Sequence, residues 1–270
     1  MPEGDTIHRA AARLRPALAG RDLIRFEAPR LVGDRPRPGV RIEAVEARGK
    51  HLLIDFADGL TLQTHLRMTG SWHLYRTGER WQKPAHLVRA LVEVEGWVAV
   101  CFAAPVVRTY RRDAVGGPLG TDVDPVGHLG PDLVEPEPDL DACIARLRSL
   151  LGPDVPAGVA LLDQRVACGV GNVYKSEVLH RCRVDPFVPA GKLDDETWRT
   201  LLGTAARLLR ANLTTARRTT VVGPPGSVAV YGRPRQPCPR CGTPIRMQRQ
   251  GEQARSTYWC PTCQPPGAPG

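Results

Sequence analysis

The residues whose spacing points most directly to chemistry are four cysteines near the C-terminal end. They form two Cys-x2-Cys pairs separated by eighteen residues, and the set is Cys238, Cys241, Cys260 and Cys263. Two such pairs can surround a Zn²⁺ ion with four thiolates, and this separation is typical of a zinc ribbon. Because four cysteines leave no open coordination position, we expect one structural zinc ion and not a catalytic one. A redox-active dithiol would need only one of the two pairs.

Arginines are concentrated around these cysteines. Arg246, Arg249 and Arg255 lie between the two pairs, where a hairpin can present their guanidinium groups to phosphate oxygens. Residues 199–263 contain eleven arginines and one acid, so they carry a charge of +10 in a chain whose net charge is +9. A general preference for arginine in the composition would not explain why acidic residues are nearly absent from this region. The pattern therefore favours DNA or RNA as a partner over an unliganded basic surface.

The second feature that could do chemistry is the start of the chain, Met1-Pro2-Glu3. Pro2 is small, so we expect Met1 to be removed, which leaves a free secondary amine. An α-amine titrates at about 7.7–8.0, well below lysine, and is partly neutral and nucleophilic at neutral pH. A secondary amine that attacks a sugar carbon forms an iminium, which is an electron sink for elimination. Glu3 beside it could shuttle a proton, although many unrelated chains begin with these three residues.

The elements that must position these groups begin with a helix near the start of the chain. Its apolar positions recur at helical spacing: Ile7, Ala11, Leu14 and Leu18. Asp5 or Thr6 is the expected N-cap, and Gly20 is the expected end. Pro16 lies inside the pattern and cannot donate a backbone hydrogen bond, so we expect a kink or a restart there.

Residues 21–109 have the pattern of β-strands joined by tight turns. Asp58-Gly59 separates two apolar segments and Glu95-Gly96 separates another two, as in β-hairpins. Several short strands of this kind predict a β-sandwich or a barrel. Pro- and Gly-rich residues 115–138 are the expected linker to the next region.

Helical periodicity begins after this linker. One helix is predicted by an apolar stripe, which consists of Leu140, Ile144, Leu147 and Leu151. Residues 159–167 and 172–181 are expected to be two helices joined by a Gly-rich turn at 168–171. Asp194 or Asp195 is expected to cap a last helix with one apolar face. The first residues lack the apolar stretch of a signal peptide, and no run of about eighteen apolar residues occurs, so we expect a cytoplasmic protein outside the membrane.

Five motifs, taken in order, resemble those of the formamidopyrimidine-DNA glycosylase/endonuclease VIII family over nearly the whole chain. They are Pro2-Glu3-Gly4-Asp5, Arg48-Gly49-Lys50, Leu161-Leu-Asp-Gln164 with Gly169-Val-Gly-Asn-Val-Tyr174, Val230-Tyr-Gly-Arg233, and Arg255 with Tyr258-Trp-Cys-Pro-x-Cys263. The resemblance implies an α+β multidomain protein. The implied parts are a catalytic β-sandwich domain at 1–125, a DNA-binding helix–two-turns–helix domain at 126–225 and a zinc finger at 226–264. A disordered tail is expected at 265–270 because it is rich in proline and glycine.

The resemblance also implies a bifunctional glycosylase and AP lyase of base excision repair, which acts on damaged DNA as a monomer. Its implied catalytic residues are Pro2, Glu3, Lys50 and Arg255. Pro2 would attack C1′ to form a Schiff base, Glu3 would open the sugar, and Lys50 would serve β or β,δ elimination. Asn172 and Arg255 would hold the phosphates that flank the lesion, and Arg233 is a further DNA-binding candidate.

Local chemistry agrees with two of these assignments. Asn172 opens a predicted helix after a Gly-rich turn, where backbone N–H groups and the helix dipole favour an anion. Lys50 follows Gly49 and precedes a predicted strand, so it can point out of a turn. The chain has only four lysines among many arginines. The overall composition therefore does not explain well why position 50 is a lysine and not an arginine.

The sequence also bears on which damaged base is removed. Met68 lies in a segment that resembles the source of a wedge methionine, but an ordinary core position is equally compatible. Residues 103–108 read Ala-Ala-Pro-Val-Val-Arg, where the purine-excising branch carries Asp-Pro-Arg-Arg-Phe-Gly. The stretch before Val230 is also short for the base-covering loop of that branch. We therefore expect an endonuclease VIII-like enzyme for oxidised pyrimidines. The alternatives are an 8-oxoguanine/formamidopyrimidine glycosylase, a non-catalytic damaged-DNA-binding protein and a zinc-ribbon RNA-binding protein.

Overall fold

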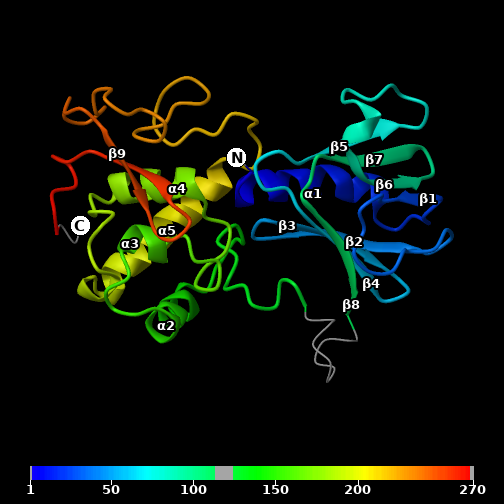
Figure 1. Cartoon of the computed structure of the whole chain (residues 1–270), viewed down its shortest axis with the longest axis horizontal. Coiled ribbons are helices and arrows are strands. Elements are labelled where there is room, and N and C mark those ends of the chain that lie inside the picture. Colours follow the sequence, from blue (N-terminus) through cyan, green and yellow to red (C-terminus); the bar gives the residue numbers. More distant parts are fainter. Residues whose placement is uncertain (1, 113–123, 268–270) are drawn as a thin grey trace. The chain divides into compact units, whose positions relative to one another are not determined.

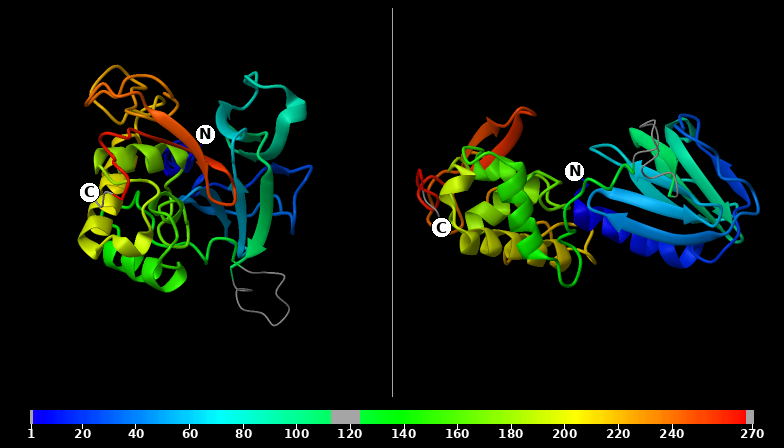
Figure 2. Two further views of the ribbon diagram at one scale, coloured as in Figure 1. Left: turned by 60° about the vertical axis from the view of Figure 1, so that its left-hand side comes forward. Right: turned by 90° about the horizontal axis from the view of Figure 1, so that it is seen from below.

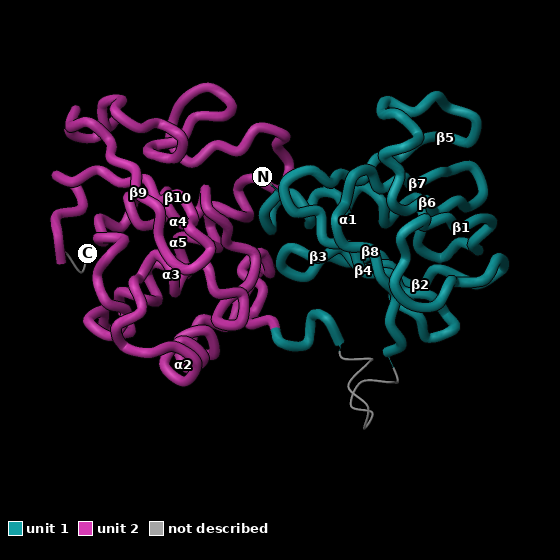
Figure 3. The backbone as a smooth tube through the Cα atoms, in the orientation of Figure 1, with its two compact units in different colours: residues 1–128 teal, residues 129–270 magenta. Residues whose placement is uncertain are grey.

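The computed structural model describes residues 2–112 and 124–267 (Figure 1). The chain forms two compact units, 1–128 and 129–270 (Figure 3). The helical segment and the four-cysteine segment therefore share the second unit. Part of the expected linker, residues 115–123, lies outside the described residues.

The described residues of unit 1 form one long helix, one short 3-10 helix and two four-stranded antiparallel sheets, which confirms the predicted β-sandwich. The strand order is β2-β3-β4-β8 in one sheet and β1-β6-β7-β5 in the other. The elements are α1 (Gly4–Leu18), β1 (Arg25–Glu27), β2 (Ile42–Arg48), β3 (His51–Phe56), β4 (Leu60–His65), β5 (Ser71–Arg76), η1 (Ala85–Leu87), β6 (Val88–Val94), β7 (Trp97–Phe102) and β8 (Val106–Arg111).

Alternation along the strands explains the sandwich. Leu52, Ile54 and Phe56 of β3 belong to one cluster of buried apolar side chains, whereas Asp55 between them is only half-buried. Helix α1 adds its four helically spaced apolar residues to the same cluster. Each fully buried side chain of this size contributes about 1.5–3 kcal/mol relative to an exposed one. This burial attaches α1 to the sandwich and so holds the start of the chain in place.

Helix α1 differs from the prediction at its start and at Pro16, whereas its end before Gly20 agrees with it. It begins at Gly4 with Glu3 as N-cap, so the expected caps Asp5 and Thr6 are wrong by two or three residues. It also runs through Pro16 without a restart. The missing N–H of Pro16 affects only the last turn, because the helix ends two residues later. Burial of Leu18 holds that turn against the sandwich core.

The predicted tight turns of unit 1 are confirmed. Asp58-Gly59 lies between β3 and β4, and Glu95-Gly96 lies between β6 and β7. Gly59 and Gly96 have positive φ values of 85° and 76°. Such a backbone conformation is accessible to glycine at little cost, which is why these turns can be so short.

Over residues 129–267, unit 2 consists of helices with one two-stranded antiparallel sheet. Its elements are α2 (Leu140–Leu150), α3 (Ala157–Ala160), α4 (Asn172–Arg181), η2 (Ala190–Lys192), α5 (Asp195–Ala211), β9 (Arg246–Gln250) and β10 (Arg255–Trp259). The expected helix at 172–181 is confirmed as α4. The expected cap of the last helix is also confirmed, since the Asp194 side chain accepts a 2.8 Å hydrogen bond from the N–H of Thr197.

The expected helix at 159–167 is wrong. Helix α3 is a single turn that ends at Ala160, and residues 161–167 form turns. Asp163 supplies the reason, because its carboxylate accepts a 2.9 Å hydrogen bond from the N–H of Arg165. A side chain that bonds the backbone two residues ahead offers an alternative to helical hydrogen bonding. The apolar spacing of this segment reflects burial in turns and not a helix face.

Helix α4 is buried along most of its length, from Asn172 to His180. The β9–β10 hairpin packs on it, as the two views of Figure 2 show. The tail differs from expectation, because residues 265–267 are described and the N–H of Gly267 donates to Asp185 at 2.9 Å. Residues 268–270 lie outside the described part. Within the described residues, no helix has the length and apolar character needed to cross a membrane.

Gly158 permits the hairpin to approach the helices. A Cβ atom placed on it would lie 2.5 Å from Oε1 of Gln250 and 3.1 Å from the carbonyl oxygen of Pro186. Gln250 is buried and its Nε2 donates to that same carbonyl at 2.8 Å, so it cannot move away freely. The glycine therefore allows this contact between α3 and β9.

We expect Gly158→Ala to lower the free energy of unfolding by about 1–3 kcal/mol, the usual range for overpacking a buried site. Gly152→Ala is the matched control, because a Cβ there meets no atom within 4 Å. Urea unfolding of both variants measures the difference. Equal stability of the two variants would contradict the steric argument.

Candidate functional site

The N-terminal end of α1 holds the first two candidate residues. Glu3 is the N-cap, and its carbonyl oxygen accepts hydrogen bonds from the N–H groups of Thr6 at 3.0 Å and Ile7 at 3.2 Å. Glu3 is fully buried, while Pro2 before it is half-buried. The start of the chain is thus built into the helix end and is not a free arm.

Lys50 lies where the sequence predicted it. Gly49 and Lys50 form the two-residue loop between β2 and β3, and Gly49 has a φ of +57°. A left-handed glycine at the first loop position suits the twist of a tight hairpin. This loop lies at the same end of unit 1 as the N-terminus of α1 (Figures 1 and 2). Pro2, Glu3 and Lys50 therefore share one end of the β-sandwich unit.

Beside Lys50 lies a polar cluster that the sequence reasoning missed. Strand pairing places His51 opposite His65, and it places Gln63 opposite Arg108, all on one face of the sheet. Nε of Arg108 donates to Oε1 of Gln63 at 2.7 Å, and Nε2 of Gln63 lies 2.5 Å from Nδ1 of His51. An arginine can only donate, so Gln63 must donate to Nδ1. His51 in its neutral form therefore carries its proton on Nε2.

Both histidines of this cluster are held in the neutral form. Burial is the largest cause that lowers the pKa of His51 to about 3, and His65, His128, Arg108 and Lys50 contribute the rest of this shift. The pKa of His65 is also lowered, to about 4. Burial is the largest cause, and the positive charge of Lys50 is the second. The available sequence signal was polar residues at alternating positions of two paired strands. Their pairing partners, however, follow only from the register.

The loop that contains Met68 is exposed. Met68 has 64% of its surface accessible, which excludes the core interpretation of this residue. Arg67 and Ala103 adopt left-handed φ values of 45° and 51°, a strained conformation for residues with a side chain. The hydroxyl of Thr69 donates to the carbonyl of Ala103 at 2.9 Å, which ties the Met68 loop to residues 103–108.

In unit 2, Asn172 is the first residue of α4, after the Gly-rich turn that the sequence predicted. Gln164 holds this turn, because its amide donates to the carbonyl of Val170 at 3.0 Å and accepts from the N–H of Gly169 at 3.1 Å. Asn172 is buried, and no described residue bonds its Oδ1 atom. The N–H groups at the start of α4 and the amide nitrogen of Asn172 can donate to an anion, whereas its unused Oδ1 atom is an acceptor and cannot.

Glu177 of α4 has a role that sequence reasoning missed. Its buried carboxylate accepts hydrogen bonds from the consecutive N–H groups of Ala229, Val230 and Tyr231 at 2.7–2.8 Å. It also accepts one from the hydroxyl of Thr220. One carboxylate thus anchors the segment that leads into the four-cysteine region. No sequence signal marked this glutamate, because its partners lie more than forty residues away.

Arg233 has its guanidinium group engaged within the chain. Its NH1 donates to the carbonyls of Val228 at 3.1 Å and Ala229 at 2.7 Å, and its NH2 donates to Pro237 at 3.1 Å. Its Nε donates to Gln236 at 3.0 Å. These bonds close a loop immediately before Cys238. Of the described candidates for DNA binding, Arg233 is the one whose nitrogens are all used for local structure.

Arg255 lies at the start of β10 and is exposed. Its Nε and NH2 atoms donate to Oε1 of Gln253 at 3.1 and 2.7 Å. A neutral glutamine oxygen is a weak competitor for a phosphate, so the guanidinium can still bind an anion.

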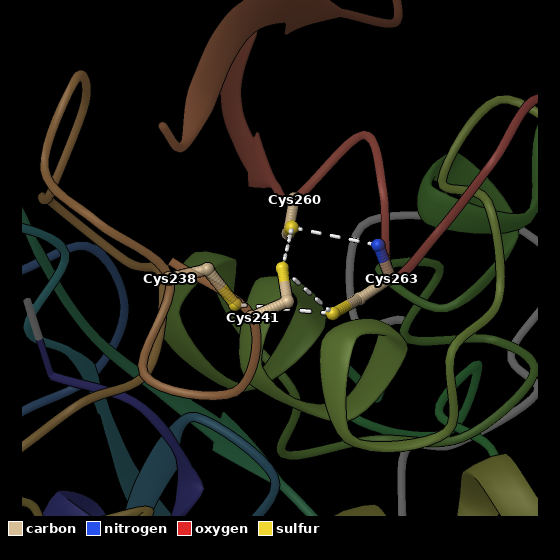
Figure 4. A group of neighbouring side chains, drawn as sticks. All are labelled: Cys238, Cys241, Cys260 and Cys263. Carbon is tan, nitrogen blue, oxygen red and sulfur yellow. Dashed lines mark hydrogen bonds between the residues drawn. The ribbon is translucent and has the colours of Figure 1, made fainter. Parts of the chain in front are cut away.

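The four cysteines converge as the spacing predicted (Figure 4). All four sulfur atoms lie within 4.8 Å of one another, and three pairs are 3.4, 3.5 and 3.9 Å apart. A tetrahedral site with Zn–S bonds of about 2.3 Å places its sulfurs about 3.8 Å apart. The donor set and its dimensions therefore fit zinc.

His180 of α4 supports this cysteine cluster. Its Nε2 atom lies 3.3 Å from the sulfur of Cys238, and the contact is buried. Burial lowers the pKa of His180 to about 4, so a neutral imidazole can donate its N–H to the thiolate. Donors of this kind orient metal ligands and stabilise their charge.

Three family models match the chain. The one described as formamidopyrimidine-DNA glycosylase N-terminal domain matches residues 1–105, and the one described as formamidopyrimidine-DNA glycosylase H2TH domain matches residues 129–222. A third, the zinc finger found in FPG and IleRS, matches residues 235–266. The chain belongs to the formamidopyrimidine-DNA glycosylase/endonuclease VIII family. This family of DNA glycosylases and lyases has the three parts that the sequence predicted, so the predicted fold class is confirmed.

Family members of both branches are similar to the chain. It is 42% identical to the probable endonuclease 8 2 of Streptomyces coelicolor, over all of the chain and 96% of that protein. It is 37% identical to the DNA-(apurinic or apyrimidinic site) lyase Nei2 of Mycolicibacterium smegmatis, over 98% of the chain and 99% of that protein. A solved structure of the MutM (Fpg) protein from Thermus thermophilus is 31% identical to the chain, with a TM-score of 0.75. The match covers 97% of the chain and 98% of the chain in that structure. The names of the first two relatives are consistent with the endonuclease VIII-like branch.

The low pKa of His51 has a consequence for the stability of this glycosylase. As the pH falls below about 6.5, the unfolded chain binds a proton at this histidine before the folded chain does. Neutral His51 therefore stabilises the fold fully above pH 6.5, and this contribution is lost as the pH falls towards the folded value of about 3.

We expect His51→Gln to reduce the loss of stability between pH 7 and pH 5 by about 1 kcal/mol, since each pKa unit is worth about 1.4 kcal/mol before screening. Urea unfolding at both pH values measures this difference. His86→Gln, which removes an exposed histidine of the same unit, is the control. An unchanged pH dependence in His51→Gln would contradict the assignment of a buried neutral imidazole.

Proposed function

We propose that this protein is a bifunctional DNA glycosylase and AP lyase of base excision repair, with Pro2 as its nucleophile. The observation that carries the proposal is the common location of Pro2, Glu3 and the Lys50 turn at one end of unit 1. Family membership supports the same chemistry. The positive end of the α1 dipole favours the uncharged form of an amine placed there, which is the nucleophilic form.

In the proposed reaction, the nitrogen of Pro2 forms a bond to C1′ of the damaged nucleotide. The bond from C1′ to the base breaks, and the base leaves with the electron pair and takes up the proton that the Pro2 nitrogen loses. Glu3 transfers a proton to the ring oxygen as the sugar opens, so Pro2 and C1′ become an iminium. Loss of a C2′ proton then expels the 3′ phosphate by cleavage of the C3′–O bond. Lys50 serves this elimination, and water finally hydrolyses the iminium and frees Pro2.

Damaged DNA is the proposed substrate, and its phosphates are the proposed ligands of unit 2. Asn172 offers a buried amide at the N-terminus of α4, and Arg255 offers an exposed guanidinium. Both are suited to phosphate oxygens, one by hydrogen bonding and one by charge. Because one chain carries the whole set, we propose that the protein acts as a monomer. Arg233 is omitted from the proposed contacts, since its nitrogens already bond the chain.

Oxidised pyrimidines are the proposed lesions. Residues 105–107 read Pro-Val-Val where the purine-excising branch carries Arg-Arg-Phe, and this segment is tied to the Met68 loop. Met68 is exposed at the tip of that loop. Its position is suited to filling the space that an extruded base leaves in the duplex.

One structural zinc ion is proposed for the four cysteines. When bound, it would hold the two ends of the segment that carries Arg255. The buried apolar cluster of this region is small and consists of Ala229, Val230, Cys238, Ile245 and Cys260. Because two members of the cluster are themselves ligands, apolar burial alone is a weak source of stability here.

Borohydride reduction tests the nucleophile, because it traps the iminium as a covalent protein–DNA adduct. We expect wild-type protein to be trapped on DNA that contains 5-hydroxyuracil or thymine glycol, and Pro2→Gly to lose trapping while it keeps its affinity for DNA. If Pro2→Gly is still trapped and the adduct maps to a residue other than the N-terminal one, another amine is the nucleophile.

The choice of lesion separates the proposed activity from its rivals. Trapping of wild-type protein only on 8-oxoguanine DNA would shift the assignment to the purine-excising activity. No adduct on any lesion or on an abasic site, together with normal DNA affinity, would identify a damaged-DNA-binding protein without catalysis. Mass spectrometry of the purified chain shows beforehand that Met1 has been removed.

Metal analysis and hydrogen exchange test the zinc proposal. We expect one zinc ion per chain, and we expect Cys260→Ser to lose the ion and the exchange protection of β9 and β10. Cys182→Ser is the control, because this half-buried thiol lies outside the cluster. A Cys260→Ser chain that keeps both its zinc and its protected hairpin would refute the assigned site.

A further inference from the structure

A lysine on α4 is fully buried and reaches into the β9–β10 hairpin. Nζ of Lys175 donates to the hydroxyl of Thr257 at 2.7 Å and to the carbonyl of Ser256 at 3.1 Å. Lys175 has no exposed surface. Burial of an ammonium group is costly unless its N–H groups are well bonded, so a lysine is seldom placed in a core for packing alone.

The hydroxyl that Lys175 binds belongs to a longer buried network. Thr257 donates to Oε1 of Gln250 at 3.0 Å, and Nε2 of Gln250 donates to the carbonyl of Pro186 at 2.8 Å. Gln250 is the last residue of β9 and pairs with Arg255 beside the 251–254 turn, and Thr257 lies two residues further along β10. The network therefore fixes both strands of the hairpin against the helices of unit 2.

Lys175 connects this network to the two residues proposed to bind phosphates. Asn172 lies three residues earlier on the same helix, and Arg255 directly precedes the bonded residues Ser256 and Thr257. The backbone N–H of Tyr258 also points to the hydroxyl of Ser176 on α4, at 3.4 Å. The start of β10 is therefore attached to the first turns of α4. A short series of buried contacts through Lys175 therefore connects Asn172 with Arg255, the two proposed phosphate-binding residues.

We propose that Lys175 is a positioning residue that sets the distance between Asn172 and Arg255 for binding the phosphates of the lesion strand. This inference depends on the proposed function, because it assumes that both residues hold DNA. An apolar side chain of similar length would fill the space of Lys175 but would leave the Ser256 carbonyl and the Thr257 hydroxyl without its N–H groups. The start of β10 would then be free to shift. A shift of about 1 Å is enough to spoil the geometry of a guanidinium–phosphate contact.

The experiment is a double-mutant cycle on DNA affinity with Lys175→Met, Arg255→Ala and the combined variant. The probe is a duplex with a stable reduced abasic site, so that no chemistry follows binding. We expect Arg255→Ala to raise Kd about 10- to 100-fold, as for loss of a charge-assisted hydrogen bond. Lys175→Met should reproduce most of that increase, and the double variant should bind no more weakly than Arg255→Ala.

The salt dependence of binding provides a readout that a general loss of stability would not give. The slope of log K against log salt should fall by about one in Arg255→Ala and in Lys175→Met alike, since each loses one phosphate contact. Lys192→Met removes a lysine that η2 carries on the surface of the same unit. In this control variant the slope should not fall by about one. The effect of Arg255→Ala on Kd should also be the same as in wild-type protein.

The outcomes separate the inference from the proposed function. Unchanged affinity in Arg255→Ala would overturn both the phosphate role of Arg255 and the inference. Weak binding by Arg255→Ala combined with normal binding by Lys175→Met would overturn the inference alone. Equal, additive losses in the cycle would also overturn it, because they would assign Lys175 an effect that does not pass through Arg255.

Thr257→Val keeps the test decisive if Lys175→Met does not fold. This substitution preserves the shape of the side chain and removes only the hydroxyl that Lys175 binds. We expect it to weaken DNA binding in wild-type protein and to have no further effect in Arg255→Ala. An equal effect of Thr257→Val in both backgrounds would overturn the inference.

Discussion

Helix α4 is buried on all sides although several of its side chains are polar, and this constraint organises unit 2. A buried charged or polar group is costly unless it is hydrogen-bonded, and three such groups on α4 have partners in distant segments. Glu177 binds the backbone at 229–231, Lys175 binds β10, and His180 contacts Cys238. One helix thereby determines where the four-cysteine segment and its arginines lie. The same helix presents Asn172 at its N-terminus.

Unit 1 has a different task from unit 2, because it holds the first described residues of the chain in place. Termini are usually mobile, but α1 buries one apolar stripe in the sandwich core and begins only two residues after Pro2. The sheet contributes a short turn with Lys50 at the same end of the unit. Beside it, the Arg108–Gln63–His51 chain keeps a neutral histidine in one tautomer.

The two units use polar groups in opposite ways. In unit 2, buried hydrogen bonds tie together segments that are far apart in the sequence, and zinc would supplement a small apolar cluster. In unit 1, apolar burial does most of the positioning, and polar residues gather on one face of the β2-β3-β4-β8 sheet. Unit 1 thus offers a fixed amine, and unit 2 by itself offers a rigid set of proposed phosphate-binding residues.

The amino-acid sequence by itself determined the local features: the sandwich strands, the tight turns, α4, the cap of α5 and the metal-binding spacing of the four cysteines. These depend on nearby residues, so periodicity, turn chemistry and spacing reveal them. It mispredicted residues 159–167, where an Asp163 turn replaced a helix, and it missed Lys175, Glu177 and His51. Only the tertiary structure revealed the bonding partners of these residues and of Arg233, and the exposure of Met68. The reason is that a buried charge or a fixed tautomer depends on partners tens of residues away, which spacing along the chain does not encode.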